Sequence, residues 1–270
     1  MSPALLRRPE SFRIGRVVAA RNITPLMRRV TVEVDDLSAF DCPPRAMGPH
    51  VHALIPREDM LEQEWPIAGE NGHAIYPPPE RRPAVRTYSV RQFNYTTNSM
   101  DIDFVLHGDE GVASRWARNA SPGDEIGLWR PHARVLENEP GRYIIAGDHT
   151  ALPAIGYILD NIPDKAVGDV FIEVPDLSEQ QPLRLPVGMK LQWFYSNLTS
   201  PSEKSKLPGA VHNVGRGLIT ESYVWLGAEA SIARKVRNYV RKEYGLPASR
   251  AYILNYWKLG SVEGSYDHGE

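Results

Sequence analysis

The chain has 270 residues, of which 42% are hydrophobic and 24% charged, as expected for a globular protein long enough to fold as two modest domains. Its 31 basic and 33 acidic residues give a net charge of −2, which excludes the bulk basicity typical of nucleic-acid-binding proteins. The single cysteine, Cys42, excludes an internal disulfide and a cysteine metal cluster. We expect a cytoplasmic protein without a membrane span, because residues 1–10 lack an apolar signal core and no window reaches the run of about eighteen apolar residues that a spanning helix needs.

The first half of the chain is predicted to consist mainly of β-strands. Apolar and polar residues alternate over residues 12–34, and the segment Ile23-Thr24-Pro25 interrupts them, which predicts a hairpin. Residues 57–83 are polar and rich in Pro and Gly, and therefore predict a long loop. Further strands are predicted at residues 51–55, 85–91, 100–107 and 125–129, and one helix at residues 112–119. Many strands with a single helix are typical of an antiparallel Greek-key barrel.

The second half alternates between predicted strands and helices. Strands are predicted at residues 142–146, 167–173, 191–195, 222–226 and 251–255, and helices at residues 150–161 and 229–243. This alternation indicates a mostly parallel sheet with helices on its faces. Residues 137–141 are polar and contain Pro140, so we place the domain boundary there, and residues 200–205 predict an exposed loop.

The segment Arg86-Thr87-Tyr88-Ser89 carries a cation, an aromatic ring and a hydroxyl on one predicted strand. Side chains alternate along a strand, so Arg86 and Tyr88 are expected on one face and Ser89 on the other. An arginine can bind a diphosphate with two parallel hydrogen bonds, and a tyrosine ring can lie flat on another ring system. The pattern is typical of a site for a flat ring joined to a diphosphate.

About twenty residues later, Gly111-Val112-Ala113-Ser114 opens the predicted helix with small residues. The free amides at such a helix start form a ready site for an anion. An ordinary edge strand followed by a capped helix would also contain either segment alone. The two together, in this order and at this spacing, favour binding of FAD.

These two segments and the strand between them resemble the siderophore-interacting proteins, a family of FAD-dependent ferric-siderophore reductases within the ferredoxin–NADP reductase superfamily. The resemblance rests on residues 83–91, 101–111 and 113–117, and supporting matches lie at residues 23–31, 147–155, 225–229 and 256–260. It implies an N-terminal antiparallel Greek-key FAD-binding β-barrel over residues 1–136 and a C-terminal doubly wound α/β, NAD(P)H-binding-like domain over residues 141–270. It also implies that the C-terminal segment covers the substrate or the flavin.

By this resemblance, residues on the central strands and at the helix start would bind FAD. They are Arg86, Thr87, Tyr88, Ser89, Asp103, His107, Gly111, Val112, Ala113 and Ser114, with Thr150 as a further cofactor residue in the second domain. NAD(P)H or ferredoxin would supply the electrons. No G-x-G-x-x-G motif follows the strand at residues 142–146, and residues 147–150 occupy the place of the family's nicotinamide loop. Arg234, Arg237 and Arg241 share a helix face, and they either bind a 2′-phosphate or form an ordinary solvated face.

The sequence departs from the family pattern at three positions, which all carry histidine. His52 stands where the family has a lysine, His132 stands at another basic position, and His149 replaces a glutamate. The Gly227-Ala228 order is also inverted. The residues expected to bind the substrate are His52, Arg130, His132 and Lys258, with His52 and His132 also as candidate catalytic residues.

Three functions are consistent with these residues. The first is reduction of a ferric siderophore, with the histidines retuning a cationic pocket. The second is a biosynthetic FAD-binding enzyme that uses His52 or His132 as general acid or base on a small organic substrate. The third is a siderophore-binding protein without turnover. A metal site is not predicted, because His50, His52, His132 and His149 lie on separate elements without local metal-ligand spacing.

Overall fold

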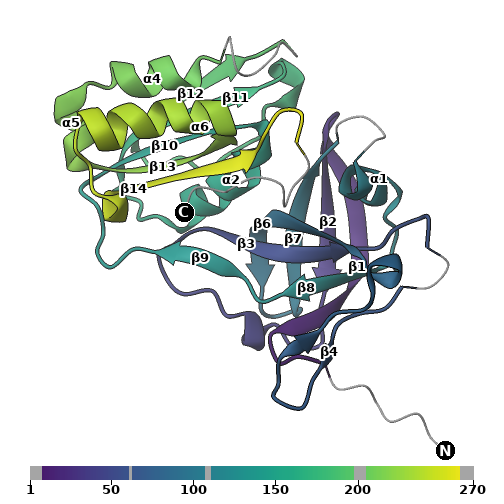
Figure 1. The fold of residues 1–270 in the computed structure, drawn as a ribbon. Coiled ribbons are helices and arrows are strands. Elements are labelled where there is room, and N and C mark those ends of the chain that lie inside the picture. The colour runs from purple at the N-terminus through teal and green to yellow at the C-terminus, as the bar shows by residue number, and fades with distance from the viewer. Residues whose placement is uncertain (1–7, 61–62, 107–110, 198–204, 262–270) are drawn as a thin grey trace, which may run out of the picture. The chain divides into compact units, whose positions relative to one another are not determined.

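The computed structural model describes residues 8–60, 63–106, 111–197 and 205–261, and the chain divides into two compact units (Figure 1). The first unit comprises residues 1–42 and 49–133, and the second comprises residues 43–48 and 134–270. In the described part of the chain, none of the helices has the length and apolar character needed to cross a membrane.

The first unit is built on an antiparallel sheet that closes on itself. Its strand order is β6-β7-β2-β1-β8-β3-β9, and an additional β6–β3 pairing closes the barrel. The strands are β1 (Phe12–Thr24), β2 (Met27–Glu33), β3 (Ala46–Ile55), β6 (Ala84–Asn94), β7 (Ser99–Val105), β8 (Glu125–Trp129) and β9 (His132–Val135). Closure leaves no long unpaired edge along the six barrel strands, which removes a common route to aggregation.

Alternating apolar side chains fill the barrel. Val30 and Val32 on β2 and Ile102 and Phe104 on β7 are fully buried, as the two-residue period of a strand requires. Helix α1 (Val112–Asn119) packs on this core through Ala113, Trp116 and Ala117, which share one helix face. Trp116 lies 5.6 Å from Phe104 between ring centroids. The helix bounds agree with those predicted from the sequence.

The predicted long loop at residues 57–83 has structure of its own. It contains a short hairpin, β4 (Ile67–Ala68) and β5 (Ala74–Ile75), followed by a 3₁₀ turn, η2 (Pro79–Arg81). Trp65 and Trp129 pack on Phe12 with ring centroids 6.3 and 5.0 Å away, and Tyr76 packs on Trp129 at 6.0 Å. Trp65 is half-buried and Tyr76 is 40% exposed, so each ring contributes less than the roughly 2 kcal/mol of a fully buried aromatic side chain. The described part of the segment is therefore packed against the barrel.

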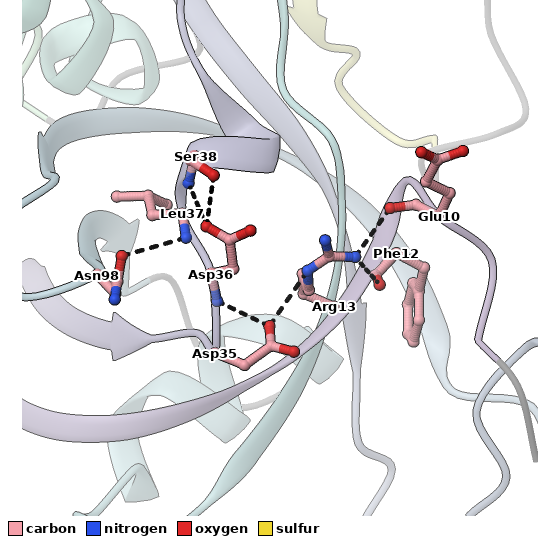
Figure 2. Close-up of polar contacts among 8 residues, drawn as sticks. All are labelled: Glu10, Phe12, Arg13, Asp35, Asp36, Leu37, Ser38 and Asn98. Carbon is pink, nitrogen blue, oxygen red and sulfur yellow. Dashed lines mark hydrogen bonds and ion pairs between the residues drawn. The ribbon is translucent and has the colours of Figure 1, made fainter. Parts of the chain in front are cut away.

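A polar network fixes the chain where it leaves β2 (Figure 2). Arg13 on β1 donates to the carbonyls of Glu10 and Phe12, and its Nε lies 3.1 Å from Oδ1 of Asp35. Asp36 accepts hydrogen bonds from the amide and hydroxyl of Ser38, at the start of the 3₁₀ turn η1 (Ser38–Phe40). These short-range bonds replace backbone pairing as the sheet ends, a usual role of Asp and Ser in turns.

The second unit is a five-stranded parallel sheet with the order β12-β11-β10-β13-β14. Its strands are β10 (Arg142–Asp148), β11 (Val167–Val174), β12 (Gly188–Tyr195), β13 (Ser222–Glu229) and β14 (Ala251–Trp257). Helices α4 (Leu207–Asn213), α5 (Arg216–Glu221) and α6 (Ala230–Arg237) lie on one face, and α2 (Leu152–Asn161) lies on the other (Figure 1). Shorter helical turns are η3 (His149–Ala151), η4 (Leu177–Glu179), the π-helical η5 (Asn238–Glu243) and η6 (Ala248–Arg250).

The strand order reverses between β10 and β13, which makes this sheet doubly wound. Gly147 and Gly227 lie opposite each other at this point. A Cβ atom on Gly227 would come within 2.7 Å of the Tyr256 ring, and one on Gly147 within 2.9 Å of the Gly227 carbonyl oxygen. The close approach explains why glycine stands at both positions.

The predicted fold class, an antiparallel barrel followed by a doubly wound α/β unit, is confirmed. Among the described residues, five strands and α-helices were not predicted, namely β4, β5, β9, α4 and α5. The predicted helix at residues 229–243 ends its α-helical part at Arg237 and continues as a π-helix. The predicted helix at residues 150–161 begins with the 3₁₀ turn η3. The predicted loop at residues 200–205 falls almost entirely outside the described residues.

Candidate functional site

Three histidine side chains of the first unit converge on one face of its sheet. His50 and His52 lie two residues apart on β3, and His132 begins β9, the neighbour of β3 in the strand order. The ring centroids are 6.4 Å apart for His50 and His52, 6.1 Å for His50 and His132, and 5.8 Å for His52 and His132. We refer to these three residues as the histidine cluster. The structure therefore brings together two predicted substrate residues, His52 and His132, and adds His50.

Strand alternation explains why the cluster forms. Val51, between the two histidines, and Ala53, directly after them, are fully buried in the barrel core, so His50 and His52 must point to the opposite face. His132 is exposed, whereas His50 and His52 are half-buried. A ligand could therefore reach the cluster from solvent.

Two hydroxyl residues of β6 share this face. His50 lies opposite Ser89 and His52 lies opposite Thr87 in the β3–β6 register. The Nδ1 atom of His52 lies 3.1 Å from the Thr87 hydroxyl oxygen, within hydrogen-bond distance, and this contact orients the ring. Ser89 is buried. The predicted separation of Ser89 from the face of Tyr88 agrees with this register, because Tyr88 lies opposite the core residue Val51.

The strands that carry and flank the cluster contain arginines. Within the described strands β3, β6 and β9, no residue is Asp or Glu, whereas Arg86, Arg91 and Arg134 are present, and Arg86 lies across from the core residue Ala53 on the face opposite to the histidines. Arg130 is exposed in the connection that leads to His132. In the described residues, no group of three or more His, Cys, Asp or Glu side chains is placed to hold a metal ion. Arg130 and Arg134 are thus the basic residues next to His132 in the sequence.

Tyr88, the predicted flavin-stacking residue, is half-buried on β6. Its ring packs on Phe104 with a centroid distance of 4.3 Å and an interplanar angle of 42°. Contact with the buried Phe104 ring on one side restricts the orientation of the Tyr88 ring. Such a rigid ring suits stacking on a flat cofactor.

A cavity of about 520 Å³ opens beside the start of β6 and helix α1. Among the described residues, its lining includes the four arginines Arg57, Arg82, Arg86 and Arg115 and two carboxylates, those of Glu58 and Asp59. Asp59 is paired with Arg57, and Glu58 lies 3.7 Å from Arg115. The volume is that of a small-molecule pocket, and the excess of arginine suits a diphosphate.

The start of helix α1 also fits an anion. Val112 lines the cavity, and Gly111 precedes the helix in an extended conformation without a side-chain capping hydrogen bond in the described structure. Ala113 and Ser114 are buried, and Ala113 packs into the barrel core. Backbone amides, rather than these two side chains, therefore face a prospective phosphate group. The ring, the arginines and the helix start together fit FAD.

Asp103, another predicted cofactor residue, is held by a neighbouring strand. Its carboxylate accepts two hydrogen bonds from Arg29, with distances of 2.7 Å from Nε and 2.8 Å from Nη2, and its side chain is fully buried. Arg29 also lies 3.6 Å from Asp101. His107, predicted beside Asp103, lies outside the described residues.

In the second unit, Thr150 contacts an acidic residue of its own loop. Oδ1 of Asp148 accepts hydrogen bonds from the Thr150 hydroxyl at 2.6 Å and from its amide at 3.0 Å. Oδ2 accepts from the Glu229 amide at 2.8 Å and from Nε1 of Trp257 at 2.9 Å. Burial raises the pKa of Asp148, although all these donors oppose the shift. The amide that begins η3 is therefore already occupied by a carboxylate of the chain.

His149, which replaces a family glutamate, has a buried acidic partner. Its Nε2 lies 3.0 Å from Oε2 of Glu179 in η4, and both side chains are buried. Burial lowers the pKa of His149, and the nearby Glu179 charge opposes this shift. Glu179 lies in an irregular segment without a motif, so the sequence offered no signal for this pairing.

The helix arginines considered for a 2′-phosphate have other partners. Arg237 donates to the Ile253 carbonyl at 2.7 Å, and Arg241 donates to the Ala251 carbonyl from Nε and Nη2 at 3.2 and 2.5 Å. Both tie the helical segment to β14, whereas Arg234 is exposed. Lys258 is exposed directly after β14.

The sequence and the fold of this chain are similar to those of known proteins. Residues 16–135 match the siderophore-interacting FAD-binding domain, and residues 140–260 match the siderophore-interacting protein family. Ferric vibriobactin reductase ViuB of Vibrio cholerae is 31% identical over 250 residues, which cover 92% of this chain and 90% of that protein. The structure of the siderophore-interacting protein SipS from Aeromonas hydrophila has a TM-score of 0.75 and 30% identity over 94% of each chain. A siderophore utilization protein from T. fusca has a TM-score of 0.81 and 30% identity over 96% of each chain.

Proposed function

The chain belongs to the siderophore-interacting protein family, and we propose that it is an FAD-dependent oxidoreductase that reduces ferric siderophores and thereby releases ferrous iron. One observation carries the proposal. The predicted flavin residue Tyr88 and the hydroxyl neighbours of the histidine cluster, Thr87 and Ser89, lie on the same short stretch of β6. A cofactor and an iron chelate bound to these side chains would be close enough for electron transfer.

The residues that would hold FAD have distinct tasks. Arg86 and the other arginines of the cavity neutralise the diphosphate, together with the amides at the start of α1. Tyr88 supports the flat ring, and Ser89 donates a hydrogen bond at its edge. When bound, FAD supplies single electrons to ferric iron, a redox step for which amino-acid side chains are unsuited.

The histidine cluster receives the ferric chelate in this proposal. His52 and His132, with Arg130 as a further cation of the same unit, attract and orient its polar or anionic donor atoms. Each iron accepts one electron and becomes ferrous, and the chelate then carries one more negative charge. Ferrous iron binds hard oxygen donors less tightly, so reduction loosens the complex and allows iron to leave.

The electron donor is NAD(P)H or ferredoxin. In the second unit, the Asp148 carboxylate occupies the amide and hydroxyl of Thr150, where a dinucleotide phosphate would otherwise bind. Arg237 and Arg241 donate to strand carbonyls. Of the three helix arginines, Arg234 is the exposed one and is therefore the residue that a 2′-phosphate would meet if NADPH were the donor.

The histidine cluster also favours one alternative. Imidazole groups near neutral pH can donate or accept a proton, so His52 or His132 could act as general acid or base on an organic substrate beside FAD. This biosynthetic role predicts turnover without iron and a rate that follows a group titrating at about 6.5.

A stopped-flow experiment separates these functions. The FAD-loaded protein is reduced anaerobically and mixed with ferric hydroxamate, catecholate and citrate chelates in the presence of a ferrous-iron trap. We expect rapid flavin reoxidation matched by trapped ferrous iron for at least one chelate. Reoxidation no faster than without chelate, across the whole panel, would refute the reductase proposal and favour the alternative.

A further inference from the structure

We infer that Asp148 is a positioning residue for the substrate, because its buried carboxylate fixes the segment of the second unit that carries Trp257 and Lys258. Lys258 is predicted from the sequence to contact the substrate, and the resemblance to the family implies that this segment covers the substrate or the flavin. Asp148 acts through the residues that it holds. The inference rests on the proposed function, because ferric-chelate reduction is the reaction in which the positioning is measured.

The carboxylate of Asp148 joins the carboxyl ends of three strands. Asp148 ends β10, and 9% of the residue is exposed. Its Oδ1 accepts hydrogen bonds from the Thr150 amide at 3.0 Å and from the Thr150 hydroxyl at 2.6 Å. Its Oδ2 accepts from the Glu229 amide at 2.8 Å, at the end of β13, and from Nε1 of Trp257 at 2.9 Å, at the end of β14. An amide in place of the carboxylate has one acceptor oxygen instead of two, so it cannot serve both pairs of donors.

Strand β14 depends on this contact because it lies at the edge of the sheet. In the described sheet, β14 pairs with β13 alone, and β10 lies beyond β13. The β13–β14 register is irregular at its end, where Ala228 lies opposite Asn255 but Glu229 lies opposite Trp257. Backbone pairing is therefore disrupted where Trp257 stands, and the Asp148 side chain supplies a hydrogen bond across the intervening strand.

A second buried carboxylate holds the residue after Lys258. Oε1 of Glu229, which is 3% exposed, accepts a hydrogen bond from the Leu259 amide at 3.4 Å. Its Oε2 accepts from the Ser231 amide at 2.7 Å, which anchors the carboxylate to the start of α6. Lys258 thus lies between two residues, Trp257 and Leu259, that the two carboxylates hold, while Lys258 itself is exposed.

A fixed backbone on both sides of Lys258 favours binding through its ammonium group. A lysine side chain is long and flexible, so ordering it on a ligand costs conformational entropy. With the backbone already fixed, only the side chain must be ordered when the substrate binds, whereas a loosened segment must order both. We therefore expect loss of the Asp148–Trp257 hydrogen bond to weaken substrate binding and to leave electron transfer to the bound chelate unchanged.

A half-reaction isolates this effect from the electron donor. The FAD-loaded protein is reduced anaerobically with dithionite and mixed with rising concentrations of the ferric chelate that the wild-type protein reduces fastest. Flavin reoxidation then gives an apparent Kd for the chelate and a limiting rate. We expect Asp148→Asn and Trp257→Phe each to raise the apparent Kd by about 5- to 30-fold, the usual effect of leaving a buried polar group without its partner, with the limiting rate within about twofold of the wild-type value.

The double variant shows whether both residues act through one contact. Each single variant removes the same hydrogen bond, so Asp148→Asn combined with Trp257→Phe should bind the chelate within about twofold of Asp148→Asn alone. Effects that multiply would show that Trp257 acts without Asp148 and would overturn the inference.

Two control variants match these substitutions in the same unit. Asp176→Asn is the control for Asp148→Asn, because Asp176 accepts from the Ser178 amide at 2.8 Å and from its hydroxyl at 2.6 Å, the same capping contact that Asp148 makes with Thr150. Trp193→Phe is the control for Trp257→Phe, because Trp193 is half-buried on β12 at the other edge of the sheet. Both controls should bind the chelate as the wild-type protein does.

The indole N–H signal of Trp257 in an NMR spectrum, identified by its absence from Trp257→Phe, reports the contact directly. In Asp148→Asn this signal should move and its hydrogen should exchange faster with solvent, whereas Asp176→Asn should leave it unchanged. An unaltered signal in Asp148→Asn would overturn the inference. If Asp148→Asn does not fold, Trp257→Phe still measures the effect on the chelate, because it deletes a single donor from a half-buried residue.

The outcomes separate this inference from the proposed function. Weaker chelate binding in both variants, with wild-type values in both controls, supports it. Wild-type apparent Kd values in Asp148→Asn and Trp257→Phe, while the wild-type protein reduces ferric chelates, overturn the inference and leave the reductase intact. Failure of the wild-type protein to reduce any ferric chelate refutes the proposed function and the inference with it.

Discussion

The ion pair between Arg29 and Asp103 allows a structural role of Asp103 to be distinguished from its predicted role in FAD binding. Its carboxylate is fully buried and accepts two hydrogen bonds from one guanidinium. Arg29→Met removes the partner and leaves this charge buried without compensation. Loss of one member of a buried ion pair costs about 3–5 kcal/mol, whereas replacement of both members by apolar residues is often nearly neutral. We therefore expect Arg29→Met to be strongly destabilising and the double variant Arg29→Met, Asp103→Leu to recover most of the loss.

Urea unfolding followed by the fluorescence of barrel tryptophans measures the effect. With a dependence of about 1–3 kcal/mol per molar urea, the single variant should lower the unfolding midpoint by at least about 1 M. The control is Arg16→Met, because Arg16 pairs with Glu125 at the surface with 63% and 44% of the side chains exposed. Removal of such an exposed pair costs less than about 1 kcal/mol.

Flavin titration of the same proteins decides the role of Asp103. If Asp103 serves only to pair with Arg29, the stable double variant should retain FAD affinity within a few-fold of the wild-type value. Recovery of stability with loss of FAD binding would refute this reasoning and assign Asp103 to the cofactor. A double variant as unstable as Arg29→Met would refute the account of the buried charge.

Three further substitutions test other parts of the structure. Tyr88→Ala should weaken FAD binding at least tenfold in a flavin titration, because it removes the supporting ring. The exposed control Tyr95→Ala should bind FAD as the wild type does, and wild-type affinity in Tyr88→Ala would contradict the stacking role. Burial lowers the pKa of His149, so the stability that this neutral histidine contributes is present above about pH 6.5 and is lost as the pH falls through its folded pKa. His149→Gln should flatten the dependence of the thermal midpoint on pH below 6.5, and the exposed control His212→Gln should leave it unchanged; an unaltered profile in His149→Gln would exclude this residue as its source. Gly227→Ala should lower the free energy of unfolding, measured by chemical denaturation, by about 1–3 kcal/mol, because the added Cβ would lie 2.7 Å from the ring of Tyr256. Wild-type stability of this variant would show that the Tyr256 ring moves freely.

The sequence correctly predicted the bounds of elements that are flanked by Gly or Pro. Helix α1 and strand β8 have the predicted bounds because Gly111 precedes the helix and Pro122-Gly123 separates the two elements. Strand β9 was missed because it is only four residues long and directly follows Pro131. Strand β3 begins before the predicted residue 51 because Gly48 and Pro49, which usually interrupt strands, are accommodated at its start.

The site was predictable to the extent that it is encoded in contiguous motifs. The resemblance to siderophore-interacting proteins is confirmed by the family comparisons, whereas the roles of the individual FAD residues stay predictions. Contacts between distant segments, such as His50 with His132 and His149 with Glu179, depend on strand order and on irregular turns. Neither spacing nor periodicity in the sequence contains that information, because a contact across the fold leaves no local pattern.

The alternation of β6 explains which departures from the family pattern this fold can tolerate. Arg86 and Tyr88 lie opposite Ala53 and Val51, and Thr87 and Ser89 lie opposite the histidines of β3. A change at His52 therefore alters the face shared with Thr87, while the buried packing that supports Tyr88 is on the other side of the strand. The face of Arg86 and Tyr88 and the face of the histidines can thus vary independently in sequence, although Thr87 and Ser89, which are also predicted to bind FAD, lie on the histidine face. This separation accounts for a chain in which the Arg-Thr-Tyr-Ser segment is intact while the basic positions around the histidine cluster have changed.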